Sequence, residues 1–529
     1  MSSVSRRGGG GAVHRRFAES ANGATLNSIS GSIKDSSANS WTLVADGSNP
    51  GFFVVYENAA PAGFTAAVQV LFYWYTSPVG HTVYQQNSAG SLYYWDNVSA
   101  WVGPVSDPRI VAGAAKRTED WRLFLAVNTH LPNPGIPDAD PALVGPAMNY
   151  LNIVTMRSNN TQAIGVSGAI TTYNNMAVTV PGLRVQLCFY YSDVNGGTIA
   201  NGVTNLMTLI NGIESAHPGT IIAVEGPNEA DISGDSNLVG WSSTQSTRIA
   251  NANTAQSQMY TAVKAAYPTK EVQLWGLGSQ GNSTAQGNQS AICDSGSVHD
   301  YVCGQYDQDI YPNVQNNYVN IVTTVNAIGK PWISGEFGFP INPLSGIASQ
   351  GTNTDVQCRM ALSQHMDHWI LGAKRSCYYN LIDDNSVGDD YGMFTSTGTP
   401  RPFATALKNM ISIMLDGGAT KLTFVPGALP VNLTNQQATG RSALLQKSNG
   451  TFYLVLWASP QIWNGFTQTA VAATPTTVAA TFTGTPNFST VRIYDPMAAT
   501  PLIQTINGPN INSASVSVLD HPMIIECIP

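Results

Sequence analysis

Residues 106–417 alternate short apolar runs with segments of helical periodicity, and this rhythm constrains the fold more than any other feature. In the helical segment 203–214, for example, apolar residues recur three and four positions apart. Eight strands that alternate with helices over about 300 residues favour a (β/α)8 TIM barrel over an open doubly wound sheet. The eight predicted strands are residues 123–127, 152–156, 184–190, 221–224, 271–275, 300–305, 331–334 and 377–382.

The segments on either side of the predicted barrel lack helical periodicity. Residues 1–24 are rich in Gly, Ser and Arg and read as a flexible tail. Residues 25–105 contain short, aromatic-rich β runs separated by turn residues, which predicts a small all-β module. Its aromatic side chains fit a core better than a sugar-stacking surface. Residues 418–529 predict a C-terminal β-sandwich, with a hairpin turn at 448–450 and strands at 421–425, 442–446, 451–457, 476–482, 490–494, 514–518 and 523–528.

The charge content excludes some partners. Charged residues make up only 11% of the chain and the net charge is −8, against about 25% charged residues in an average soluble domain. No Lys/Arg patch supports nucleic-acid binding, and no run of about 18 apolar residues predicts a membrane span. The arginines at 6, 7, 15 and 16 precede no apolar stretch, so no signal peptide is visible. We nevertheless expect an extracellular or particle-associated protein, because the polar surface must consist largely of Asn, Ser, Thr, Gln and Gly.

Two of the predicted barrel strands run into carboxylates. Strand four leads into Glu225-Gly226-Pro227-Asn228-Glu229, and strand seven leads into Glu336. The carboxyl ends of barrel strands meet at one rim, where TIM barrels build their active sites. Retaining hydrolysis of a glycosidic bond needs two carboxyl groups across such a rim, one protonated and one ionised. The alternative is that both glutamates are rim residues in salt bridges.

The order, the spacing and the preceding Asn of these two glutamates resemble the catalytic pair of the retaining glycoside hydrolases of clan A. That resemblance implies a (β/α)8 barrel with Glu229 as acid/base and Glu336 as nucleophile. It also implies that Asn228 binds the sugar 2-hydroxyl and that no cofactor is required. The chain departs from the clan at Ala230, where Pro is usual, and it leaves Glu225 as a rival proton donor or substrate contact.

Further substrate contacts are expected at the other strand ends. The resemblance places an Arg that orients the nucleophile after strand two, and Arg157 stands there. It places a Tyr after strand six, where Tyr306 and Tyr311 compete, and often a Trp at strand eight, which this chain lacks. The remaining candidates are Asn128, His130, Trp241, Tyr378, Asn380 and Asp383.

Two patterns point to cofactors but lack the required context. Residues 276–281 match G-x-G-x-x-G, yet the polar, non-periodic residues after them do not predict the helix that a dinucleotide site needs. His365 and His368 lie three apart on one predicted helix without a visible third ligand, so we expect a solvated helix face and no metal.

The sequence therefore predicts a retaining glycosidase that cleaves β-glycosidic bonds of a polysaccharide or oligosaccharide. One alternative is a non-catalytic carbohydrate-binding or virion/surface structural protein that keeps the barrel as a scaffold. Another is an inverting or transglycosylating enzyme on the same barrel.

Overall fold

The structure is a computed structural model of the 529-residue chain. It describes the backbone of eight strands between residues 12 and 105. It then describes residues 115–133, 135–160, 164–189, 198–232, 242–302, 310–341, 351–384, 390–437, 439–464, 467–483 and 488–529. The chain divides into two compact units, Met1–Ala112 and Gly113–Pro529.

The first unit contains two antiparallel sheets of four strands each. One has the order β1-β4-β3-β2 and the other β5-β6-β7-β8. The strands are β1 (Ala12–Arg16), β2 (Gly31–Lys34), β3 (Ser40–Ala45), β4 (Phe52–Glu57), β5 (Leu71–Ser77), β6 (Gly80–Gln86), β7 (Leu92–Trp95) and β8 (Trp101–Val105).

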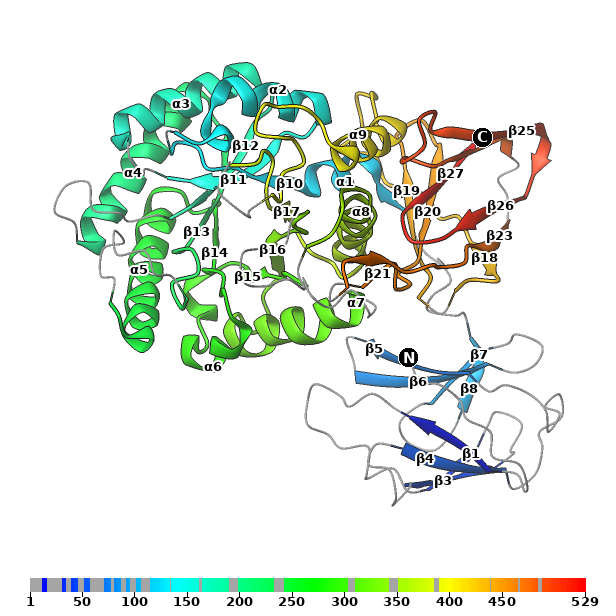
Figure 1. The fold of residues 1–529 in the computed structure, drawn as a ribbon. Coiled ribbons are helices and arrows are strands. Elements are labelled where there is room, and N and C mark those ends of the chain that lie inside the picture. Colours follow the sequence, from blue (N-terminus) through cyan, green and yellow to red (C-terminus); the bar gives the residue numbers. More distant parts are fainter. Residues whose placement is uncertain are drawn as a thin grey trace. The chain divides into compact units, whose positions relative to one another are not determined.

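The centre of the second unit is an eight-stranded parallel sheet that curls into a nearly closed barrel (Figure 1). Its order is β14-β13-β12-β11-β10-β17-β16-β15, and a parallel bridge between Gln273 and Ser295 joins the two end strands. The strands are β10 (Leu125–Asn128), β11 (Thr155–Asn159), β12 (Arg184–Cys188), β13 (Ile221–Glu225), β14 (Glu271–Gln273), β15 (Gly296–His299), β16 (Trp332–Phe337) and β17 (Ser376–Tyr378).

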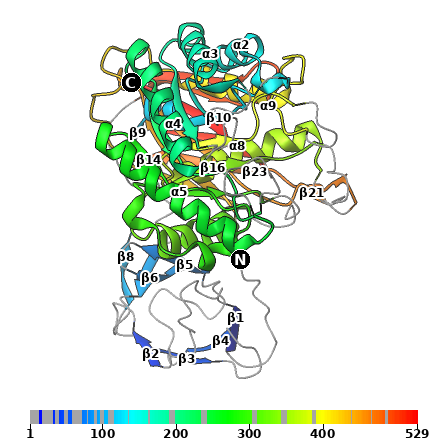
Figure 2. The same ribbon diagram turned by 90° about the vertical axis from the view of Figure 1, so that its left-hand side faces the viewer.

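Helices surround these strands (Figures 1 and 2). In α4, a buried stripe that includes Leu206, Ile210 and Ile213 faces the barrel, and the Thr198 side chain caps the first turn. The helices are α1 (Thr118–Phe124), α2 (Pro141–Leu151), α3 (Gly165–Thr179), α4 (Ile199–Ala216), α5 (Gln245–Ala266), α6 (Ser283–Gln286), α7 (Ile310–Asn313), α8 (Thr354–Ile370) and α9 (Pro402–Met414), and π-helical turns at Val314–Val319 and Val322–Asn326 extend α7. In the described part of the chain, no helix is both long enough and apolar enough to cross a membrane.

Mostly antiparallel sheets contain the strands that follow the barrel, and one of these sheets also includes β9, which precedes it. A six-stranded sheet has the order β25-β24-β27-β20-β19-β9, and a three-stranded sheet has the order β18-β23-β26. The predicted hairpin turn joins β19 to β20. The strands are β9 (Lys116–Arg117), β18 (Val431–Thr434), β19 (Arg441–Gln446), β20 (Phe452–Trp457), β23 (Thr476–Phe482), β24 (Phe488–Tyr494), β25 (Leu502–Ile511), β26 (Ser513–Val518) and β27 (Met523–Ile528), and β21 (Trp463–Asn464) pairs with β22 (Thr469–Ala470).

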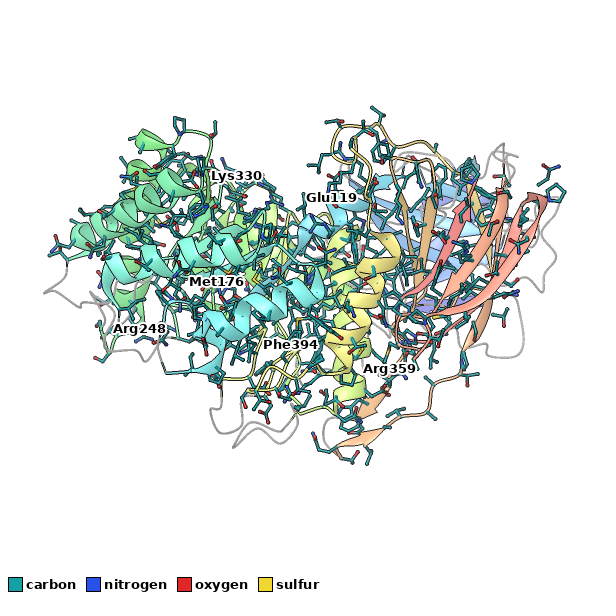
Figure 3. All side chains as sticks on the ribbon, turned by 90° about the horizontal axis from the view of Figure 1, so that it is seen from above. Glu119, Met176, Arg248, Lys330, Arg359 and Phe394 are labelled. Carbon is teal, nitrogen blue, oxygen red and sulfur yellow. The ribbon has the colours of Figure 1, made fainter. Side chains whose placement is uncertain are left out.

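Helix α8 lies between the barrel and these C-terminal strands. Trp457 donates its indole N–H to Asp367 at 2.9 Å, and Arg359 pairs with Asp520 at 2.8 Å. Figure 3 labels Arg359 where the barrel meets the C-terminal strands. The side chains of His365 and His368 are both buried, and each forms a hydrogen bond with Ser376 on β17. The predicted solvated face of α8 is therefore wrong.

The predicted fold class, a TIM barrel with β-rich segments on both sides, is confirmed. Several elements differ from expectation. β1 lies within the predicted tail at 1–24, strand two is β11 (Thr155–Asn159) and not residues 152–156, and β18 and β25 were not predicted. Strand six is β15 (Gly296–His299) and not residues 300–305, and residues 421–425 form a turn in which Val425 is exposed.

Candidate active site

Arg157 ties together the strands at the barrel rim. It lies within β11, a strand whose five residues are all buried although four of them are polar. Its guanidinium pairs with Glu225, donates to Glu336 at 2.7 Å, and donates to Asn128 at 2.9 Å and Asn228 at 2.7 Å. One cation thus fixes four side chains from three strands, β10, β13 and β16, and from the turn after β13.

Glu225 is the buried counter-ion of Arg157. Its side chain is fully buried and also accepts hydrogen bonds from Gln186 at 2.9 Å and Ser297 at 3.0 Å. Burial alone would raise its pKa, but Arg157 and His299 hold the pKa well below its usual range. Glu225 is therefore ionised and inaccessible, so it is neither a proton donor nor a substrate contact.

Glu336 is held as a carboxylate on β16. Burial raises its pKa, while the charges of His299 and Arg157 and a hydrogen bond from Tyr301 lower it, and the net shift is downward. The Tyr301 hydroxyl donates at 2.7 Å and Arg157 at 2.7 Å, so both carboxylate oxygens have partners. An ionised, oriented carboxylate is what a nucleophile requires.

Glu229 occupies the turn after β13 with a φ of 42°, a left-handed conformation that is uncommon outside glycine. His299 Nδ1 lies 2.7 Å from its carboxylate, and the Glu229 side chain is 23% exposed. Burial would lower the pKa of His299, but Glu336, Glu225 and Glu229 raise it to about 10. The imidazolium therefore donates to Glu229. One carboxylate oxygen each of Glu229 and Glu336 and a nitrogen of His299 all lie within 4.8 Å of one another.

Tyr301 occupies the position for which Tyr306 and Tyr311 were proposed. Tyr311 instead lies under the Arg441 guanidinium, 4.4 Å from its ring centroid. Tyr306, like Trp241, lies outside the described residues. The prediction failed because strand six was placed at 300–305, which put Tyr301 inside the strand and left His299 in the loop before it. His299 as the last residue of a short polar strand, with Tyr301 two positions further on, is the signal that locates them.

At strand eight the exposed residue is Tyr379 and not Tyr378. Tyr378 is fully buried, packs 4.6 Å from Phe403, and donates to a main-chain carbonyl, so it cannot contact sugar. Tyr379 is half-buried and lies edge-on to Tyr301 and His130. Its ring therefore contacts Tyr301, the residue that donates to Glu336.

The other predicted contacts have mostly structural partners. Asn128 donates to the main chain of β16 and β17 and is buried. Asn380 is 1% exposed, and Asp383 pairs with Arg401. His130 is partly exposed and bonds Asp138 at 2.9 Å. Burial would lower the pKa of His130, but this carboxylate raises it. Of these four, Asn128 supports the site through Arg157, and His130 is the partly exposed one.

Glu229, His299 and Glu336 are also the set in the described residues that could hold a metal ion. A metal would have to displace the proton that the raised pKa places on His299. The G-x-G-x-x-G segment shows no phosphate cradle, because the N–H groups of Gly278 and Ser279 donate to Asp231.

Comparison with known proteins identifies the fold. No protein-family model matches the sequence, and no curated protein matches it. A solved 4-O-α-L-rhamnosyl-β-D-glucuronidase from Fusarium oxysporum is similar over 80% of this chain and 99% of its own, with 12% identity and a TM-score of 0.50. A family 51 α-L-arabinofuranosidase from Bifidobacterium longum is similar over 80% and 98%, with 13% identity and a TM-score of 0.47. A glycoside hydrolase family 17 β-1,3-glucanosyltransferase from Rhizomucor miehei is similar over 54% and 97%, with 12% identity and a TM-score of 0.39.

The chain has the fold of the clan A glycoside hydrolases. The clan A fold was predicted from the glutamates that follow strands four and seven, and the similarity to the Fusarium oxysporum enzyme confirms it at the level of the fold. At 12% identity the likeness carries no residue roles, so those roles rest on the geometry of the site.

Proposed function

We propose that this protein is a retaining glycoside hydrolase in which Glu336 is the nucleophile and Glu229 the acid/base. The observation that carries the proposal is that one carboxylate oxygen of Glu229 and one of Glu336 lie within 4.8 Å of each other across the rim. Retaining enzymes place their carboxyl groups about 5–5.5 Å apart, whereas inverting enzymes leave about 6.5–9.5 Å for a water molecule.

The two glutamates differ in the way that double displacement requires. Glu336 is 92% buried and faces two cationic groups and a Tyr hydroxyl, which favour the ionised form. Glu229 is the more exposed of the two and has one charged partner, His299. In the first step Glu336 attacks the anomeric carbon, and Glu229 passes the proton that it shares with His299 Nδ1 to the leaving oxygen as that bond breaks.

In the second step Glu229, now a carboxylate, takes a proton from water. That water attacks the anomeric carbon, the bond to Glu336 breaks, and the sugar leaves with its original configuration. Asn228 is held by Arg157 through its Oδ1, which leaves its amide N–H groups free of that bond and able to donate to the sugar 2-hydroxyl. Tyr379 supplies the aromatic surface on which the sugar ring rests.

The substrate is a β-linked polysaccharide or oligosaccharide, in an extracellular or particle-associated setting. To find the sugar, we would screen 4-nitrophenyl glycosides of glucose, glucuronic acid and arabinofuranose together with plant and bacterial polysaccharides. The first-formed anomer is then read by proton NMR, and retention of configuration is expected.

Replacement of the nucleophile is the sharpest test. Glu336→Gln should reduce turnover by roughly 10⁴-fold or more, because the covalent step is lost. The matched control is Glu271→Gln, since Glu271 is also ion-paired, with a side chain only 10% exposed, but begins β14 at the opposite end of the barrel.

Full activity in Glu336→Gln would exclude the proposed nucleophile, and an inverted first product would exclude the retaining mechanism. If wild type and Glu336→Gln both bind a polysaccharide and neither releases reducing ends, the barrel is a carbohydrate-binding scaffold instead.

A further inference from the structure

The glycine-rich loop at residues 276–281, which resembles a dinucleotide-binding motif, contacts the turn that carries Glu229. This residue lies beyond the end of β13, so the barrel sheet does not fix its direction. Its backbone is left-handed, and its N–H donates to the carbonyl of Gly276 at 3.2 Å. A non-glycine residue keeps such a conformation only when its surroundings impose it.

The surroundings are organised by Asp231, two residues further along. Asp231 is fully buried, and its carboxylate accepts three hydrogen bonds at 2.9 Å. The donors are the N–H groups of Gly278 and Ser279 and the side-chain amide of Asn282, all from the loop after β14. One carboxylate therefore joins the Glu229 turn to the glycine-rich loop.

Arg248 of α5, labelled in Figure 3, holds the same turn from the other side. Its guanidinium donates to the carbonyl oxygens of Ala230 and Asp231, each at 3.0 Å. Gln245 donates to the Asp231 carbonyl as well, at 3.1 Å. Main chain and side chain of the turn are thus anchored to two separate elements.

The two glycines let the loop approach the acid/base. A Cβ on Gly276 would lie 2.2 Å from His299 Nε2. A Cβ on Gly278 would lie 3.2 Å from Glu229 Cδ and 2.3 Å from Ile232 Cδ1. The loop therefore forms the wall behind the Glu229 carboxyl group, while His299 Nδ1 holds that group from the front.

We propose that Asp231 is a positioning residue, which seats the glycine-rich loop at residues 276–279 against Glu229 and so aims its carboxyl group at the leaving oxygen. This inference rests on the proposed function of Glu229 as acid/base. It predicts a defect confined to proton transfer, because Asp231 touches neither Glu336 nor the groups around it.

Leaving-group dependence separates this role from general destabilisation. A 2,4-dinitrophenyl leaving group departs without a proton, whereas a phenyl leaving group needs one from Glu229. In Asp231→Asn, one acceptor oxygen becomes a donor that faces the loop N–H groups. We expect kcat/KM for the phenyl glycoside to fall about 100-fold and that for the 2,4-dinitrophenyl glycoside to fall less than about threefold.

Asp416→Asn is the matched control. Asp416 is buried and likewise accepts loop N–H groups, from Ser448 at 2.7 Å and Gly418 at 2.8 Å, but it lies after α9. This variant should lower the melting temperature about as much as Asp231→Asn and leave both kcat/KM values unchanged. Equal losses on both glycosides in Asp231→Asn, or no loss on either, would overturn the proposal.

Gly278→Ala with Ile232→Ala provides a second variant if Asp231→Asn does not fold. Truncating Ile232, which is 51% exposed, removes the closest clash and leaves only the approach to Glu229. The same selective loss on the phenyl glycoside is expected, and equal losses contradict the role of the loop.

If the wild-type protein hydrolyses no glycoside, the proposed function fails, and a crystal structure of Asp231→Asn still tests the positioning. A Glu229 carboxylate displaced from His299 would support it, and an unmoved one would overturn it.

Discussion

At the scale of the residue, His299 connects the two carboxylates. Its Nδ1 lies 2.7 Å from Glu229 and 3.9 Å from Glu336, and its ring is buried. The positive charge on this ring offsets the repulsion between two carboxylates that stand close together. His299 is thus an electrostatic support for the whole site.

Because His299 must stay protonated to give this support, the free energy of unfolding should fall at alkaline pH. The folded pKa of His299 is raised from 6.5 to about 10, because the surrounding carboxylates outweigh the burial that would lower it. A raised pKa contributes stability that is complete below about pH 6.5 and is lost as the pH rises through about 10. The difference in unfolding free energy between wild type and His299→Gln should therefore shrink between pH 6.5 and 10 in urea titrations. A constant difference over that range would contradict the assigned charge.

The same residue shows what sequence patterns leave out. Glu229, Glu336 and Arg157 were identified because they stand at or near the ends of recognisable apolar strands. His299 was missed because β15 reads Gly-Ser-Val-His, and polar side chains fill the barrel interior where an apolar pattern was sought. Ser297, for example, points inward to Glu225.

At the scale of the element, α8 is covered on one side by the barrel and on another by the C-terminal strands. Nearly every residue from Val356 to Trp369 is buried, which removes the amphipathic pattern that marks a surface helix. The prediction of a helix around His365 and His368 was therefore right and the prediction of its solvated face wrong, since periodicity reports one covered face and not a second.

The contact between α8 and β20 provides a test of that double burial. Trp457→Phe keeps the aromatic packing and removes the N–H donor to the fully buried Asp367. We expect a loss of about 1–3 kcal/mol in unfolding free energy, because a buried carboxylate loses a hydrogen bond. Chemical denaturation measures this loss, and kcat/KM should be unchanged. A stability equal to wild type would show that the bond contributes nothing.

At the scale of the whole molecule, the barrel and the C-terminal sheets belong to one compact unit. Arg359 and Ser363 of α8 both bond Asp520, and Lys447 of the C-terminal sheet donates to a carbonyl of α9. Deleting residues 418–529 would expose the side of α8 that these strands cover.

We therefore expect the truncated chain to be insoluble or molten rather than an active barrel. Near-ultraviolet circular dichroism of residues 113–417, beside residues 113–529, would show this as a loss of fixed aromatic signals. A soluble, cooperatively unfolding and active truncation would show instead that the barrel folds alone.

The short strand β9 is synthesised long before the strand with which it pairs. Lys116 and Arg117 come before the barrel, yet they pair in parallel with Leu445 and Gln446 of β19. At about 5–20 residues per second, a ribosome reaches β19 roughly 15–65 s after it has made β9. During that interval the whole barrel emerges while β9 waits without its partner. Its two positive charges protect it during that interval, because lysine and arginine on an unpaired strand discourage pairing with another chain.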